Sequence, residues 1–196
     1  AGKSATANNI GRAIGNRADF NEFGEDGGAA SYTRAPQTVR FEWAGKFIAV
    51  TDTPGLLDAA GVAQDEKNIR QIVDYARNQN EVHSFILVIN EQNPRLEGPV
   101  QDAIKVLVDS FGSQIMNNFG IVFTRSTTRT KEESVQWVDR EAKRMLEMKL
   151  GFSIRHIPSW QVDNHPEDLA VLKVPQEQIE KNKAQSKTAL LEMTRW

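Results

Sequence analysis

The 196-residue sequence contains no cysteine, so neither disulfide bonds nor thiolate metal ligands hold this protein together. It also lacks a long apolar run, since the run Phe85–Ile89 is far too short to span a bilayer. Charge of one sign does not dominate, because 24 basic and 26 acidic residues leave a net charge of −2. This balance argues against an electrostatic surface for DNA or RNA, and we expect no nucleic-acid partner.

The apolar patterns that are present predict one α/β domain. Helical spacing occurs at residues 3–14, 64–79, 99–111, 131–150 and 176–195, and strand patterns occur at 38–43, 47–51, 85–89, 119–123 and 152–157. The first two strands form a hairpin, and the others alternate with helices. We therefore expect a doubly wound, mostly parallel central sheet with one antiparallel edge strand. Residues 1–175 form the expected domain, and residues 176–196 form a C-terminal helix that packs on it.

Two short motifs carry the chemistry. Ala1-Gly2-Lys3-Ser4 matches the second half of a phosphate-binding P-loop, in which the Lys reaches the outer phosphates and the Ser hydroxyl binds Mg²⁺. Asp52-Thr53-Pro54-Gly55 follows the apolar strand Phe47–Val50. In a nucleoside-triphosphate switch, such an Asp binds Mg²⁺ through water and the Gly amide contacts the γ-phosphate. The two motifs together predict that Gly2, Lys3, Ser4, Ala5 and Gly55 bind a nucleotide.

A complete P-loop follows a buried strand, and its first glycine lies several residues before the Lys. Neither feature precedes Gly2 in this sequence. We therefore expect the first strand of the fold to be absent from the given chain. Residues 15–36 are rich in Gly, Asn and Asp, which is typical of a long mobile loop.

Several segments resemble the GIMAP family, the GTPases of immunity-associated proteins, which is also called the avirulence-induced-gene family. Lys3–Arg12 is similar to its GKSATGNSILGR stretch, and Asp52–Leu56 to its DTPG followed by an apolar residue. Phe85–Ile89 and Ile121–Arg125 are similar to a later strand and to the FTR segment. The resemblance covers residues 1–165 and implies a P-loop GTPase of the septin-like class, with GTP or GDP and Mg²⁺ as ligands.

The resemblance also assigns roles to residues outside these motifs. It implies a first switch whose Thr binds Mg²⁺ in the triphosphate state, and Thr33 lies at the family's distance before Asp52, with Thr38 as the alternative. Leu56 stands where Ras-like enzymes place a water-orienting Gln, so we expect slow intrinsic hydrolysis. The resemblance implies that dimers across the nucleotide face supply the missing help, as they can in this family and in septin-like relatives. Arg95 is then either a catalytic residue acting in the partner's site or an ordinary solvated loop residue.

Base recognition departs from the family pattern. The guanine-reading segment of GTPases ends in Asp, whereas Thr124-Arg125-Ser126-Thr127 ends in Thr, so the discrimination against adenine should weaken. Arg125 can still cover the base. Trp160 in the later loop either stacks on the base or packs on the last helix, and Asp163 or Asn164 can replace the lost contact.

These features predict a guanine-nucleotide switch with slow, dimer-stimulated hydrolysis. A nucleotide-controlled oligomeric scaffold with negligible turnover and a P-loop ATPase remain as alternatives. We expect a homodimer or oligomer across the nucleotide face. The expected location is cytoplasmic, with membrane association through missing or C-terminal segments as an option, because the last helix carries Lys181, Lys183 and Lys187 among apolar residues.

Overall fold

A computed structural model describes residues 2–15, 19–24, 33–56, 62–79, 81–92, 94, 96, 98–125, 130–165 and 175–195. Its elements follow in the order α1 (Lys3–Ile14), β1 (Gln37–Trp43), β2 (Lys46–Asp52), α2 (Val62–Arg77), β3 (Phe85–Asn90), α3 (Gly98–Phe111), η1 (Ser113–Asn118), β4 (Phe119–Thr124), α4 (Lys131–Trp137), η2 (Val138–Ala142), α5 (Lys143–Leu150), β5 (Ser159–Val162) and α6 (Gln176–Arg195). None of the helices within these ranges is long and apolar enough to cross a membrane.

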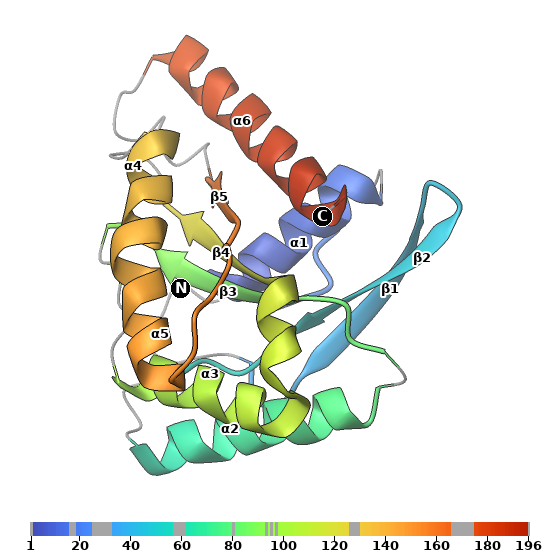
Figure 1. Cartoon of the computed structure of the whole chain (residues 1–196). Coiled ribbons are helices and arrows are strands. Elements are labelled where there is room, and N and C mark those ends of the chain that lie inside the picture. The colour runs from blue at the N-terminus through green and yellow to red at the C-terminus, as the bar shows by residue number, and fades with distance from the viewer. Residues whose placement is uncertain are drawn as a thin grey trace.

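The predicted α/β architecture with a parallel sheet is confirmed. Strands β3, β4 and β5 pair in this order and run parallel. Alternate residues of the central strand β4 point to opposite faces. Ile121 and Phe123 join a core with α3, η1, η2 and α5, whereas Val122 joins a second core with α1 and α6. Helices thus cover both faces of the sheet, as Figure 1 shows.

The predicted antiparallel pair is also confirmed, and it forms a sheet of its own. Strands β1 and β2 pair from Gln37 with Asp52 to Trp43 with Lys46. Their two-residue turn has positive φ at both Ala44 and Gly45, the combination that matches the twist of a tight hairpin. Figure 1 shows the turn of this hairpin reaching out from the body of the domain. Within the described residues, no backbone ladder joins β2 to β3, so the expected single sheet is seen as two.

The prediction of a strand at residues 152–157 is wrong. This segment has no regular structure, and the last strand of the sheet is β5, Ser159–Val162. Ile154 and Ile157 explain the apolar pattern, because both are buried in the core beneath α5 without belonging to the ladder. Pairing begins at Pro158, whose carbonyl accepts from the Ile121 amide at 2.9 Å, and β5 follows directly.

Residues 15–36 were expected to form a mobile loop. Within this range, the segment 19–24 is instead anchored to α1. Phe20 and Phe23 are completely buried and pack with Ala7 of α1. Asn8 holds the Phe23 backbone at both ends, donating to its carbonyl at 2.9 Å and accepting from its amide at 3.0 Å. Gly11 permits this contact, since a Cβ there would lie 2.4 Å from the Phe20 ring. Residues 25–32 lie outside the described part of the chain.

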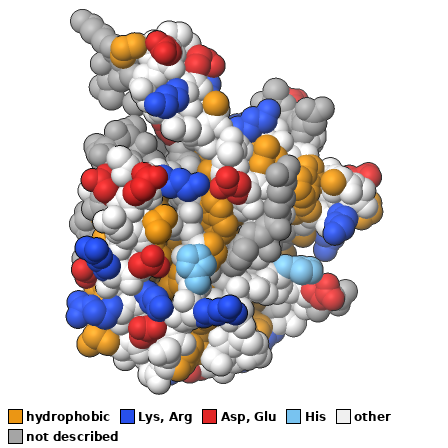
Figure 2. Space-filling view, turned by 45° about the horizontal axis from the view of Figure 1, so that its top comes forward, with side chains coloured by type: hydrophobic (Ala, Val, Ile, Leu, Met, Phe, Trp, Pro, Cys, Tyr) orange, Lys and Arg blue, Asp and Glu red, His pale blue; other side chains and the backbone are white. Residues whose placement is uncertain are grey.

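The last helix, α6, contacts β5 and α1. Its apolar side chains Ile179, Leu190 and Met193 are buried, and Leu190 and Met193 belong to the core that α1 shares. Its lysines lie on the exposed side. The apolar residues of α6 therefore serve packing on the domain. Figure 2 shows basic and acidic side chains mixed on the face that it presents.

Candidate functional site

Three of the residues predicted to bind Mg²⁺ meet at one carboxylate. Asp52 ends β2 and is 3% exposed. Its Oδ2 accepts hydrogen bonds from the Ser4 hydroxyl at 2.7 Å and from the Thr33 hydroxyl at 2.8 Å. The two hydroxyl oxygens lie 3.4 Å apart. Ser4 lies at the start of α1, Thr33 lies shortly before β1 and Asp52 ends β2, so three distant segments converge here.

The chemistry of this cluster fits a magnesium ion. Mg²⁺ prefers oxygen ligands, and hydroxyls from a P-loop and a carboxylate are the donors that such sites use. The second carboxylate oxygen, Asp52 Oδ1, is buried and has no hydrogen-bond partner among the residues that the structure describes. An unpaired buried carboxylate oxygen is costly, and a bound cation or its water shell would satisfy it.

Of the two switch threonines considered, Thr33 is the one that faces Asp52. Thr38 lies within β1, where its hydroxyl pairs with that of Thr51 at 2.7 Å and with the hydroxyl of Tyr75. The preference for a threonine on the loop over one in the strand therefore agrees with the geometry.

The phosphate side of the site centres on Gly2 and the first turn of α1. Gly2 has φ +80 and precedes Lys3, the first residue of the helix. The positive φ favours glycine, and a Cβ at Gly2 would press on the Asn164 side chain, whose amide nitrogen would lie 3.1 Å away. The free amides of this helix start, with Lys3 and Ala5 in the first turn, are suited to bind phosphate oxygens.

Asn164 lies beside the phosphate loop, and its side chain bonds to α1. Its Nδ2 donates to the Gly2 carbonyl at 3.2 Å and to the Thr6 hydroxyl at 3.0 Å, and its Oδ1 accepts from Asn9 at 3.0 Å. We call these contacts the Asn164 clamp. The clamp joins the segment after β5 to the start of α1, so the expected base contact of this side chain competes with an internal one.

The other predicted base-side residues lie at the ends of β4 and β5. Thr124 is buried and its hydroxyl donates to the Ile89 carbonyl at 3.3 Å. Arg125 is exposed with φ 56, a conformation that is uncommon for a residue with a side chain and often found at functional sites. The Asp163 amide donates to Ser186 of α6 at 2.8 Å. Thr127 lies outside the described residues.

Trp160 was expected on a loop, but it lies in β5. It is 7% exposed and packs in the core between the sheet, α1 and α6 with Ile10, Val122 and Leu190. The packing alternative therefore describes this residue, and stacking on a base does not. The neighbouring Gln161 points to the opposite face, where it donates to the buried Glu91 at 2.7 Å.

Replacing Trp160 with Phe tests this placement. We expect the variant to lose about 1–3 kcal/mol of stability, because the smaller ring leaves part of the core unfilled. Nucleotide affinity should stay within about twofold of the wild type, a difference below 0.5 kcal/mol. Chemical denaturation and a nucleotide titration measure the two quantities. A large loss of affinity without loss of stability would contradict the packing role.

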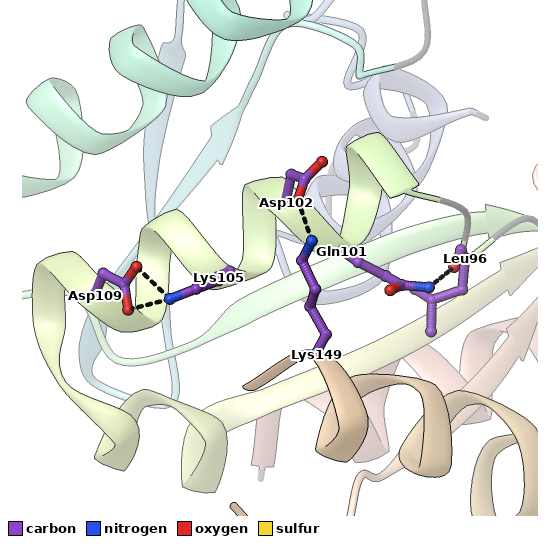
Figure 3. Close-up of polar contacts among 6 residues, drawn as sticks. All are labelled: Leu96, Gln101, Asp102, Lys105, Asp109 and Lys149. Atoms are coloured by element: carbon purple, nitrogen blue, oxygen red, sulfur yellow. Dashed lines mark hydrogen bonds and ion pairs between the residues drawn. The ribbon is translucent and has the colours of Figure 1, made fainter. Parts of the chain in front are cut away.

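The loop that carries Arg95 begins after β3 and ends at α3. Arg95 itself lies outside the described residues. Its neighbour Leu96 is fully buried, and the Leu96 carbonyl accepts from Gln101 of α3 at 2.6 Å, as Figure 3 shows. On the same helix, Asp102 pairs with Lys149 of α5 at 2.5 Å and Lys105 with Asp109 at 2.7 Å. The C-terminal side of the loop is thereby fixed to α3, and α3 is tied to α5.

The Asp-Thr-Pro-Gly segment ends against α2. Gly55 is buried, and its carbonyl accepts from Asn68 of α2 at 2.7 Å. Leu56 packs on the apolar cluster of Ile69, Val73 and Ala103, between α2 and α3. Leu56 thus anchors this segment to two helices, which agrees with its lack of a polar atom for orienting water.

No motif in the sequence pointed directly to Thr6, Asn9, Asn68 or Glu91. A weak signal existed for the asparagines, because Asn is a poor helix former and often hydrogen-bonds when it lies inside a helix. Glu91 is buried at the carboxyl end of β3 and accepts from Ser134 of α4 at 2.7 Å as well as from Gln161. It supports the end of the sheet below Thr124, whose carbonyl accepts from the Glu91 amide at 3.0 Å.

A parallel sheet covered on both faces, a helix that starts at Gly-Lys-Ser and an Asp at the end of a neighbouring strand define the P-loop nucleotide-binding class. The family model described as "AIG1 family" matches residues 1–156. The chain belongs to the AIG1 family, which confirms the resemblance found in the sequence.

Solved structures with a similar fold include Toc33 from Arabidopsis thaliana. A dimerization-deficient mutant of Toc33 superposes with a TM-score of 0.64 at 16% identity, covering 83% of this chain and 66% of Toc33. Toc33 in complex with GDP and Mg²⁺ gives a TM-score of 0.63 at 16% identity, with the same coverage of 83% and 66%. Toc33 with Mg²⁺ and GMPPNP gives 0.62 at 18% identity, again with 83% and 66%. The chain thus spans slightly less than two thirds of these proteins, and the likeness shows the fold.

Proposed function

We propose that this protein is a GTPase switch that binds GTP or GDP with Mg²⁺ and hydrolyses GTP slowly. The observation that carries the proposal is that the hydroxyls of Ser4 and Thr33 both donate to one carboxylate oxygen of Asp52. Thr33 belongs to a loop and can leave Asp52, whereas Ser4 and Asp52 belong to regular elements. A site in which one of three ligands is carried by a loop suits a protein that distinguishes the triphosphate from the diphosphate state.

Residue roles follow from this arrangement. Ser4, Thr33 and Asp52 would hold Mg²⁺, which would supply positive charge beside the phosphates. Lys3 and the amides at Gly2 and Ala5 hold the phosphates, and the Gly55 amide contacts the γ-phosphate. The base is surrounded by Thr124, Arg125, Asp163 and Asn164. To contact the base, Asn164 gives up part of its hydrogen bonds to α1. Residues 1–175 form the nucleotide-binding domain, and α6 covers it.

Hydrolysis is proposed to depend on a second copy of the chain. Leu56 supplies no polar atom to orient water, so the intrinsic rate is low. One of the similar structures is of a dimerization-deficient Toc33 mutant, and dimerization is important for the GTPase activity of the chloroplast translocon components atToc33 and psToc159. In this chain, Arg95 is the residue we propose to reach the partner's nucleotide. The apolar side of α6 is buried against the domain, so we do not assign membrane association to it.

A competition titration of full-length protein against fluorescent GDP and ADP, with Mg²⁺ present, tests the guanine assignment. Preference for GDP supports it. Equal affinity or preference for ADP would mean that the change to Thr127 removed guanine specificity, and the protein would be an ATP-binding relative. Binding of neither nucleotide would overturn the switch and leave a P-loop domain used for interaction.

The dependence of turnover on protein concentration tests the dimer. We expect turnover per molecule to rise with concentration, and Arg95→Ala to lower the rate at high concentration by at least about tenfold, since an arginine supplied by a partner contributes more than this in related enzymes. Nucleotide affinity should remain. Tight GTP binding without turnover at any concentration would instead favour the nucleotide-controlled scaffold, a class that the apolar anchoring of Leu56 also suits.

A further inference from the structure

Asn68 is a buried side chain that no motif assigns to the nucleotide site. It lies in the middle of α2, is 2% exposed, and donates from Nδ2 to the Gly55 carbonyl at 2.7 Å. A carbonyl can only accept, so this contact fixes the orientation of the Asn68 amide. The other end, Oδ1, accepts from Gln64 one turn earlier at 2.7 Å. Asn68 is therefore held in place by its own helix while it grips the Asp-Thr-Pro-Gly segment.

The same face of α2 makes a second polar contact. Tyr75 lies two turns after Asn68, and its hydroxyl bonds to that of Thr38, which in turn pairs with Thr51 at 2.7 Å. Residues near two full turns apart share a helix face. Thr51 directly precedes Asp52, and Thr38 lies in the strand that follows Thr33. One side of α2 thus touches the backbone of Gly55 and, through Tyr75, Thr38 of β1, which in turn pairs with Thr51 next to Asp52.

Apolar packing makes this helix a firm support. Ile69 and Val73 pack with Ala103 of α3, and Leu56 packs against the same cluster. The Gly55–Leu56 step is therefore held to α2 from both of its sides, by a hydrogen bond to the carbonyl and by the Leu56 side chain. A rotation of Gly55 toward a phosphate would act on α2 through both contacts.

We propose that Asn68 is a positioning residue that orders Gly55 for the γ-phosphate and couples this contact to α2. The inference rests on the proposed function, because it names how the triphosphate state is sensed. The bond holds the peptide plane between Gly55 and Leu56. It thereby limits the orientations open to the preceding peptide plane, which carries the Gly55 amide. The triphosphate uses the Gly55 amide held in this way, whereas the diphosphate lacks the γ-phosphate that would contact it.

The test compares the affinities of full-length protein for fluorescent GMPPNP and GDP with Mg²⁺. We expect Asn68→Ala to lower the affinity for GMPPNP relative to GDP by roughly threefold to tenfold, the effect of one lost hydrogen bond. Asn68→Asp keeps the shape but places an acceptor against the Gly55 carbonyl, so it should lower the ratio at least as much. Asn78→Ala, at an exposed position just after the same helix, is the matched control.

Two further measurements separate positioning from general support. Thermal melts identify any variant that fails to fold, and hydrogen exchange of the nucleotide-free protein reports the segment around Leu56 independently of binding. We expect faster exchange there in Asn68→Ala. An unchanged or raised GMPPNP-to-GDP ratio in a folded variant would overturn the coupling alone. A wild type that binds neither nucleotide would overturn the proposed function and the coupling together.

Discussion

Asp52→Asn is expected to lower the affinity for Mg²⁺ in the nucleotide complex by about 10–100-fold, the range found when a carboxylate that supports a metal site is replaced. The physical reason lies in the charge of the buried Asp52 carboxylate. Asn offers an oxygen of similar shape for the Ser4 and Thr33 hydroxyls but carries no negative charge for the cation. The measurement is nucleotide affinity as a function of Mg²⁺ concentration.

The fold should survive this change, because both hydroxyl contacts to Oδ2 can be kept by the Asn oxygen. A melt in the absence of nucleotide provides the check. Asp109→Asn is the matched control, since Asp109 pairs with Lys105 on the exposed side of α3, away from this cluster. A Mg²⁺ dependence identical to that of the wild type would contradict the placement of Asp52 in the metal site.

Phe20→Ala is expected to destabilise the protein by about 3–5 kcal/mol, the usual effect of removing a buried aromatic ring. Phe20 is 1% exposed and packs edge-on against Phe41 of β1, with the two ring centroids 5.8 Å apart. Its ring also packs on Gly11 of α1. Deleting the ring therefore opens a cavity between α1, the hairpin and the segment 19–24. Because domains are stable by about 5–15 kcal/mol in total, this is a large fraction.

Urea denaturation measures the loss, and Phe47→Ala supplies the control. Phe47 is 82% exposed on the hairpin, so removing its ring should change stability by less than about 0.5 kcal/mol. Equal effects of the two substitutions would contradict the anchoring of residues 19–24. A loss confined to Phe20→Ala would show that this segment belongs to the folded core.

The parts of the candidate site that could be predicted from the sequence are those whose chemistry is local. Gly2 and Lys3 bracket a helix start, and Asp52 follows an apolar strand, so residue type and neighbours suffice. The position of Thr33 near Asp52 could be predicted because the resemblance to the family supplied the spacing between these two residues. The strand after residue 150 was placed too early because Ile154 and Ile157 are buried for packing, and burial alone does not reveal pairing.

Other features depend on contacts between residues far apart in the chain. The Asn164 clamp joins residues 158 positions apart, and a single sequence holds no signal for such a partner. Trp160 illustrates a different limit, since an aromatic residue near a binding loop has the same local context whether it stacks on a ligand or fills a core. Burial by α1 and α6 decided this case, and that is a property of the whole fold.

The Asn164 clamp has a consequence for the rate at which a nucleotide leaves. Because one side chain bonds to Gly2, Thr6 and Asn9, we expect the segment after β5 and the start of α1 to move together. Pulling the first away from the domain also displaces the second. A protein that accelerates nucleotide exchange therefore needs to grip only one of these two segments to loosen both.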